Sequence, residues 1–169
     1  MLLWFCGTAI VSVWFVFRDP TFDYRLLCLG ALLPDAIDVW FGGARALHSI
    51  TTSIFVLLGV VVASAGRKRW RKRALAIPIG MMLHLVYDGA FTKAKLFWWP
   101  LGGLHFRDVP LPSVSRGLLD VPFELLGAMM LVWVWRTFGL RSPARRQVFW
   151  RTGRLDPVPR PVGAVQRRR

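Results

Sequence analysis

Hydrophobic residues are concentrated in five stretches along the chain, separated by short segments that carry charges, glycine or proline. The five stretches are Leu2–Phe17, Leu26–Phe41, Ser49–Ala65, Ala74–Phe91 and Leu118–Trp135. Each lies near the short end of the roughly 17–25 residues expected for a membrane-spanning helix. The pattern predicts an all-α fold, a multi-pass membrane bundle of about five hydrophobic helices, with residues 1–135 as the membrane-embedded domain.

The first stretch has a second interpretation, a secretory signal peptide. However, no basic residue precedes it, and Arg18, Asp19 and Pro20 follow it where a cleavage site needs small residues. We therefore interpret it as a membrane helix.

The segment after Trp135, residues 136–169, has a different composition. It is rich in arginine, contains four prolines, and shows no apolar periodicity in its last fifteen residues. It is predicted to be a basic, largely disordered tail that lies against anionic lipid headgroups. RNA or DNA binding is the alternative, but no nucleic-acid partner is expected because no aromatic platform or nucleic-acid motif accompanies the charge.

Composition supports a membrane protein. The chain has 169 residues, is 54% hydrophobic, and still carries a formal net charge of +14. A disordered basic protein would lack the apolar residues, and two cysteines are too few for a disulfide scaffold. High charge and high hydrophobicity together indicate apolar helices joined by basic loops.

The distribution of lysine and arginine predicts the orientation. Six of the seven residues from Arg67 to Arg73 are basic, and the tail contains ten arginines. Cytoplasmic loops are enriched in such residues, so both regions are expected in the cytoplasm, with the N-terminus on the outer side. The expected location is the bacterial inner membrane, with membrane lipids as partners.

Ionisable residues inside the apolar stretches gather at one predicted level. They are Asp35, Asp38, His48, His84, Asp88, Asp120 and Glu124. The predicted topology brings all seven near the extracytoplasmic face, because the helices that carry them alternate in direction, and the first five are the candidates for a site. Intramembrane ionisable groups are costly and usually mark function.

Their spacing favours a metal site. His84 and Asp88 are four residues apart and Asp35 and Asp38 three apart, so each pair shares a helix face. Carboxylates with imidazoles suit Zn²⁺, Mn²⁺ or iron, as one ion or a pair. Asp120, with Pro122 behind it, is expected to cap the fifth helix.

Four motifs in this order resemble a known family. They are Leu32–Asp38, His48-Ser49, His84–Asp88 and Trp99-Pro100. The set resembles the YdjM family, inner-membrane metal-dependent hydrolases that are described as LexA-binding. The resemblance covers roughly residues 28 to 102 and implies Asp35, Asp38, His48, His84 and Asp88 as the metal-binding and catalytic set. LexA binding is not carried over, since no residue of this chain can be tied to it.

The motifs also depart from the family pattern. The acidic pair is Asp-x-x-Asp rather than Asp-x-Asp, and Leu47 replaces the threonine before His-Ser. Gly43 and Ala44 stand where the family has His-Arg. If that histidine is a ligand, His105 is a candidate substitute.

The resulting expectation is a membrane-bound metal-dependent hydrolase. Asp38, with Asp35, is the expected catalytic carboxylate, and a phospholipid or lipid-linked phosphoester is the expected substrate. The cations Arg45, Lys93, Lys95 and Arg107 would receive a phosphate, or else are solvated loop charges. The alternatives are a non-enzymatic membrane protein with a structural Asp/His staple, and a proton relay.

Overall fold

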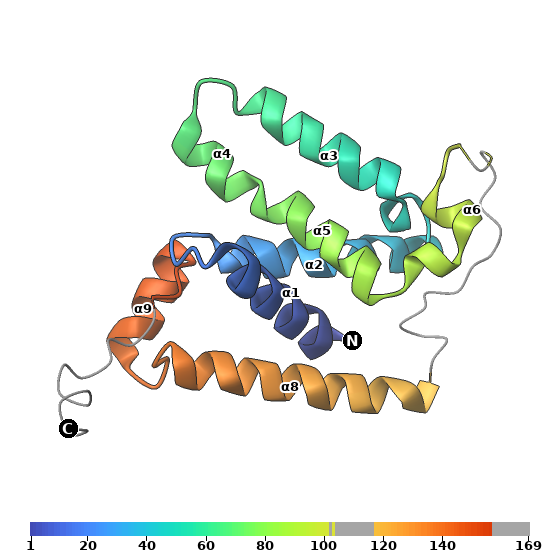
Figure 1. Cartoon of the computed structure of the whole chain (residues 1–169). Coiled ribbons are helices and arrows are strands. Elements are labelled where there is room, and N and C mark those ends of the chain that lie inside the picture. Colours follow the sequence, from blue (N-terminus) through green and yellow to red (C-terminus); the bar gives the residue numbers. More distant parts are fainter. Residues whose placement is uncertain (102, 104–116, 157–169) are drawn as a thin grey trace, which may run out of the picture.

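The protein is made of helices joined by turns. The computed structural model describes residues 1–101, 103 and 117–156, and contains no strand among them. The elements are α1 (Leu2–Phe17), α2 (Tyr24–Asp38), η1 (Val39–Phe41), η2 (Ala46–His48), α3 (Ile50–Ala63), α4 (Lys68–Ala74), α5 (Ala76–Tyr87), η3 (Ala90–Thr92), α6 (Ala94–Phe97), η4 (Gly117–Leu119), α8 (Asp120–Thr137) and α9 (Pro143–Thr152). The predicted all-α class is confirmed (Figure 1).

The predicted stretches coincide with helices. The first has the bounds of α1, and the second corresponds to α2 followed by η1. Helix α2 begins after Asp23, whose side chain accepts a hydrogen bond from the Leu26 amide, and it continues through Pro34. The carboxylates that follow Pro34 therefore stay on a helix.

Two local expectations need correction. The basic run predicted as a loop forms the helix α4, because lysine and arginine are good helix formers. Asp120 is the first residue of α8 rather than its cap; Leu119 holds the cap position and makes no side-chain bond.

One helical segment is long and apolar enough to cross a membrane by length and composition. It is Gly117–Thr137, of 21 residues. Helices α1 and α3 are apolar but shorter, and the remaining predicted spans do not meet this criterion within the described residues. Length and composition thus support one possible span.

Glycines bring the helices into close contact at two crossings. Helix α2 lies against α5, where a Cβ at Gly30 would come 2.1 Å from the Ile77 carbonyl oxygen. A Cβ at Gly80 would lie 2.3 Å from the Leu27 carbonyl oxygen. Helix α1 approaches α8 in the same way, and a Cβ at Gly127 would lie 2.3 Å from the carbonyl carbon of Leu3. Such small-residue contacts are typical of helix pairs in membranes.

The outer surface of the bundle is apolar. Only Ser53 of α3 is buried, while large side chains of that helix face outward. Helix α8 likewise exposes apolar residues along its length, and the two helices lie at opposite edges of the molecule (Figure 1). The exposed residues include Ile54, Phe55, Leu58, Val61 and Val62 of α3 and Leu125, Leu126, Met129, Val132 and Trp133 of α8.

The first part of the predicted tail is ordered, which corrects the expectation of a largely disordered segment. Residues 143–152 form α9, and Leu155 is buried with its amide bonded to the Pro20 carbonyl. The Gly153 carbonyl accepts from the Tyr24 amide. These contacts fasten residues 136–156 to the start of α2; residues 157–169 lie outside the described residues.

Candidate metal centre

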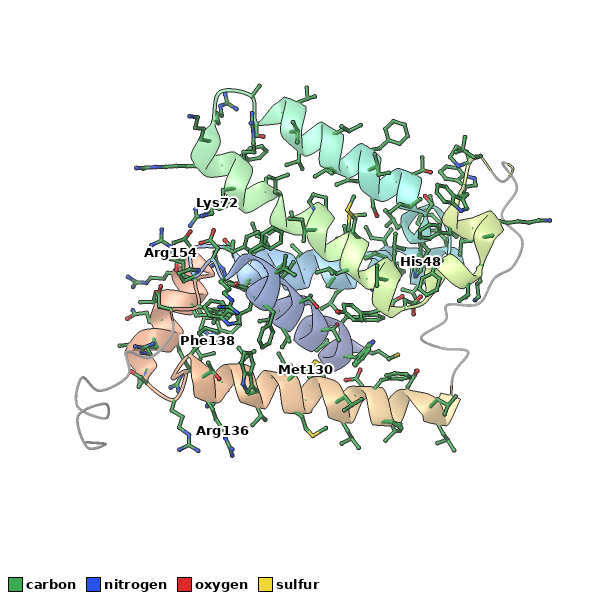
Figure 2. All side chains as sticks on the ribbon, viewed as in Figure 1. His48, Lys72, Met130, Arg136, Phe138 and Arg154 are labelled. Atoms are coloured by element: carbon green, nitrogen blue, oxygen red, sulfur yellow. The ribbon has the colours of Figure 1, made fainter. Side chains whose placement is uncertain are left out.

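Helices α2 and α5 and the short helix η2 bring the predicted site residues together. Asp35 and Asp38 lie in the last turns of α2, His84 in the last turn of α5, and His48 at the end of η2. Asp88 follows α5 directly. Figure 2 shows His48 at one end of the molecule and the basic residues Lys72 and Arg154 at the other. The structure thus brings these residues together, while their common depth in a membrane stays a prediction.

His84 is held by a backbone carbonyl. Its Nδ1 lies 2.7 Å from the Ala31 carbonyl oxygen, which can only accept a hydrogen bond. The proton is therefore on Nδ1, and Nε2 carries the lone pair. This Nε2 is buried and lies 3.6 Å from Oδ1 of Asp35.

The Gly30–Gly80 crossing makes this bond possible. Gly80 precedes His84 by one helical turn, and a Cβ there would lie 2.7 Å from the Ala31 nitrogen. The backbones of α2 and α5 therefore touch next to the bond between His84 and Ala31. The position of the imidazole is set by contact between two helix backbones.

His48 is held by a carboxylate. Its Nδ1 lies 2.7 Å from Oδ2 of Asp38, and the same oxygen accepts the Arg45 amide at 2.7 Å. The Nε2 of His48 then faces Oδ1 of Asp35 at 3.3 Å. A histidine oriented by a carboxylate through its far nitrogen is the usual arrangement of metal-binding imidazoles.

Asp35, His48 and His84 form a group that could bind a metal ion. One ligand atom from each lies within 4.8 Å of the others. Neither Nε2 has a hydrogen bond among the described residues, although both histidines are fully buried. Zinc bonds of about 2.0–2.1 Å at tetrahedral angles separate neighbouring ligand atoms by about 3.4 Å. The two distances to Asp35 Oδ1, 3.3 and 3.6 Å, are close to this value, so the donor set fits such an ion.

Asp38 and Asp88 stand outside this group of three. Asp38 lies behind His48, with one oxygen already bonded to that ring and to the Arg45 amide. Asp88 is buried, and its Oδ2 is 3.9 Å from Nε2 of His48. The geometry thus gives Asp38 an orienting position and leaves Asp88 beside the group.

The charge of His48 follows from its surroundings. The residue lies between the second and third apolar helices. Burial lowers its pKa, but the adjacent carboxylates of Asp35 and Asp38 raise it more, to about 9. At neutral pH the imidazolium is thus balanced by these carboxylates, and a metal ion would displace its proton.

Asp35 is the member of the group that reaches the surface. Its side chain is 20% exposed, although the Oδ1 that faces the histidines is buried, whereas both histidine side chains are at 0%. A ligand would therefore approach from the Asp35 side.

The predicted phosphate-binding cations are only partly placed. Arg45 immediately precedes η2, where its Nε donates to the Phe41 carbonyl at 2.9 Å. Lys93 lies between η3 and α6, and α6 contacts η2. Lys95 is exposed on α6. Arg107 and the substitute ligand His105 lie outside the described residues.

Two features of the structure were not anticipated, one at the group and one on α3. The Ala31 carbonyl fixes His84, and no sequence signal marks a backbone acceptor of this kind. Ser53 is the sole buried residue of α3, and its Oγ has no hydrogen bond among the described residues. Its position one turn after Ser49 was a signal for a polar face on an otherwise apolar helix.

Comparisons of the chain with protein-family models, with curated proteins and with solved structures found no match. The resemblance to the YdjM family therefore stays a prediction.

Proposed function

We propose that the protein is a membrane-bound metal-dependent hydrolase whose ion is held by Asp35, His48 and His84. The observation that carries this proposal is the convergence of two buried, unbonded imidazole nitrogens on one carboxylate oxygen. Burying such nitrogens without a hydrogen bond of normal geometry costs free energy, and a metal ion bound between them and Asp35 would remove that cost. The proposal agrees with what the resemblance to the YdjM family implies.

We further propose that several helices, and not α8 alone, are embedded in the membrane. The apolar outward faces of α1, α3 and α8 support this, because soluble monomers rarely expose apolar surface over several helices. The glycine crossings support it as well. The basic end of the bundle would face the cytoplasm, and the metal group would lie near the extracytoplasmic face.

The side chains around the group have separate roles in this proposal. Asp38 and the Ala31 carbonyl hold the two imidazoles in the tautomer that presents Nε2. Asp88 is a buried carboxylate beside His48 and is placed to accept a proton from water. A divalent ion such as Zn²⁺ or Mn²⁺ would supply Lewis acidity, polarising an ester oxygen and lowering the pKa of water.

The substrate class follows from position and charge. In a bundle embedded as proposed, a group that opens beside Asp35 at the end of the helices is reached by amphiphilic molecules at the headgroup level. Arg45 and Lys93 lie on segments that adjoin the site and can receive a phosphate. A phospholipid or lipid-linked phosphoester is the proposed substrate.

Metal content tests the site. Wild type purified in detergent is compared with His84→Ala, and with Asp120→Asn as the control outside the group. We expect one or two zinc or manganese ions in the wild type and in Asp120→Asn, and their loss in His84→Ala. A folded wild type without metal after incubation with Zn²⁺ and Mn²⁺ would contradict the proposal.

Hydrolysis separates an enzyme from a structural staple. Release of phosphate or headgroup from mixed micelles is measured with and without the bound metal. We expect activity in the wild type that Asp35→Asn and Asp88→Asn abolish and Asp120→Asn retains. Bound metal with no hydrolysis across phosphoester classes would assign the group a structural role instead.

A further inference from the structure

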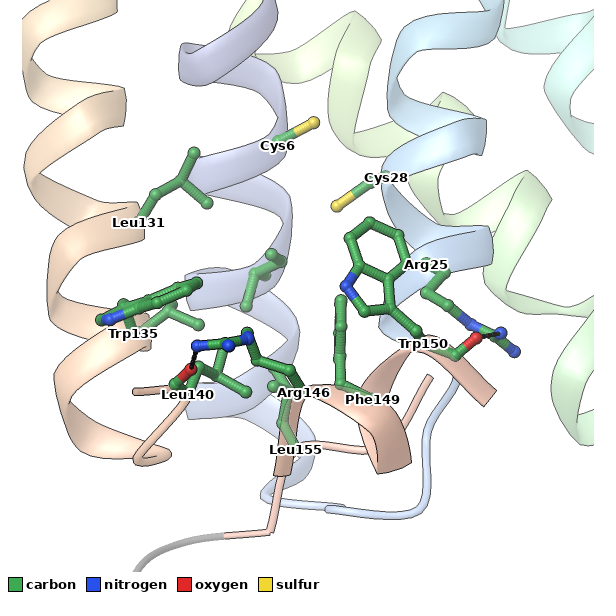
Figure 3. A pocket seen from close by; sticks show the side chains of 12 residues that line it. Cys6, Arg25, Cys28, Leu131, Trp135, Leu140, Arg146, Phe149, Trp150 and Leu155 are labelled. Atoms are coloured by element: carbon green, nitrogen blue, oxygen red, sulfur yellow. Dashed lines mark hydrogen bonds between the residues drawn. The ribbon is translucent and has the colours of Figure 1, made fainter. Parts of the chain in front are cut away.

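A second feature extends from the middle of the bundle to its basic end, and none of its lining residues belongs to the metal group. A cavity of about 440 Å³ separates α1 and α2 from α8 and α9. Its size is within the roughly 300–1,000 Å³ of small-molecule sites. Figure 3 shows Cys6 and Cys28 pointing toward one another at one end of the cavity, and Arg146 beside Trp135 at the other.

The walls of this cavity are apolar with a cationic end. Isoleucine, leucine, valine and aromatic side chains form most of the lining, together with the two thiols. Arg25 and Arg146 are its charged residues, and no carboxylate lines it. The composition suits a hydrocarbon chain that ends in a negative charge.

The two arginines differ in how their charge is balanced. Arg25 donates to both oxygens of Asp23, at 3.1 and 2.9 Å, and also bonds the Trp150 carbonyl. Its charge is therefore matched within the protein.

Arg146 has neutral partners instead. Its guanidinium donates to the carbonyls of Leu140 and Arg141 at 3.3 and 3.0 Å and lies 5.8 Å from the Trp135 ring. No carboxylate pairs with it among the described residues. Carbonyls and an aromatic face leave the positive charge available to an anion.

From this combination we infer that the cavity binds an anionic glycerophospholipid, with one acyl chain between the thiols and Trp135 and the phosphate at Arg146. The surrounding end of the protein carries the basic helices α4 and α9, where anionic headgroups accumulate. Trp150, whose side chain is 69% exposed beside the cavity, suits the interface between chain and headgroup. This site is separate from the proposed hydrolytic centre.

The two cysteines provide the measurement. They are the only cysteines of the chain, and both are free. The rate of their alkylation by N-ethylmaleimide is followed by intact mass in neutral detergent. Phosphatidylglycerol, phosphatidylcholine with the same acyl chains, or glycerol 1-phosphate is added. We expect several-fold slowing with phosphatidylglycerol, less with phosphatidylcholine, and none with glycerol 1-phosphate.

Variants test the headgroup contact. Arg146→Gln should remove the preference for phosphatidylglycerol, while Arg151→Gln, an exposed arginine of the same helix, should retain it. Leu131→Trp should slow alkylation without lipid by filling the cavity. Thermal unfolding of each variant shows that it is folded, and native mass spectrometry of wild type provides a second measure of retained phosphatidylglycerol.

Equal protection by both lipids, or a preference that survives in folded Arg146→Gln, would overturn the proposed site. Protection by neither lipid, with no phosphatidylglycerol retained by wild type, would overturn it as well. Metal content depends on His84, which does not line the cavity, so this result is independent of the hydrolase proposal.

Discussion

The two ends of the helical bundle accommodate charge in opposite ways. At the end that contains Asp35, His48 and His84, the imidazoles are buried and each has a fixed partner on its far nitrogen. At the end that contains α4 and α9, most lysines and arginines are exposed. Burying polar groups costs free energy that exposed groups avoid. The comparison teaches that each charged group at the buried end depends on specific partners, whereas the charged groups at the basic end are stabilised by solvent.

The largest expected effect concerns the sides of the membrane on which these ends lie. A reporter fused after Arg169 should report the cytoplasm, and a glycosylation or labelling tag inserted after Gly42 should report the outer side. The signals are all-or-none, because each tag lies on one side. If both tags report the same side, the proposal that the two ends lie on opposite sides of the membrane is contradicted.

The next prediction addresses the crossing that supports the buried end. Gly30→Ala would place a Cβ 2.1 Å from the Ile77 carbonyl, so α2 and α5 must separate. We expect a loss of about 1–3 kcal/mol or more in unfolding free energy, as for overpacked cores. Thermal unfolding and zinc content in detergent measure the effect.

Gly59→Ala is the matched control, because no atom lies within 4 Å of its added Cβ. It should leave stability unchanged or raise it by up to about 1 kcal/mol, since alanine favours helix. Equal melting temperatures for the two variants would show that the close approach is not required.

A smaller effect, on metal affinity, is expected from Asp38→Asn. This variant tests how much the hydrogen-bond partner of His48 contributes to metal binding. Removing an orienting carboxylate lowers metal affinity by about 10–100-fold, while the ligands remain. Competition with a chelating dye measures the affinity, with Asp120→Asn as the control. A loss as complete as that of Asp35→Asn would instead make Asp38 a ligand, as the sequence motif suggests.

The smallest effect belongs to the basic end. A hydrogen bond from Lys72 is the main cause that lowers the pKa of Asp19, and both side chains are partly exposed. The pair therefore stabilises the fold above the ordinary pKa of an aspartate, and this contribution is lost as pH falls through the lowered value.

Lys72→Gln should weaken this acid dependence, since the hydrogen bonds from Thr21 to Asp19 remain, and should cost less than about 1 kcal/mol because exposed pairs are weak. Urea unfolding between pH 3 and 7 measures it, with Lys68→Gln as the control. A cost of several kcal/mol in unfolding free energy would show that charged groups at the basic end also depend on specific partners.

The positions of the apolar helices could be read from the sequence. Helix α1 ends where the apolar run ends, because Arg18, Asp19 and Pro20 interrupt both. The shared faces of Asp35 and Asp38 and of His84 and Asp88 also follow from local spacing, since helical periodicity is a property of neighbouring residues. These predictions needed no knowledge of distant contacts.

The individual roles of the site residues could not be predicted from local spacing. Whether Asp38 contacts metal or orients His48 depends on a contact between α2 and η2, and the Ala31 carbonyl carries no side-chain signal. The order of α9 depends on the bonds of Gly153 and Leu155 to residues more than a hundred positions earlier. Sequence periodicity contains no information on such long-range pairings.

The contact between Gly30 and Gly80 also bears on which ions the centre accepts. Two backbones in contact cannot move closer, and widening the gap would break the bond between His84 and Ala31. The separation of α2 and α5 therefore fixes the distance between Asp35 and His84 before any ion binds. The donor chemistry would then select the ion: two imidazole nitrogens and one carboxylate suit Zn²⁺, whereas Ca²⁺ takes six to eight oxygen ligands.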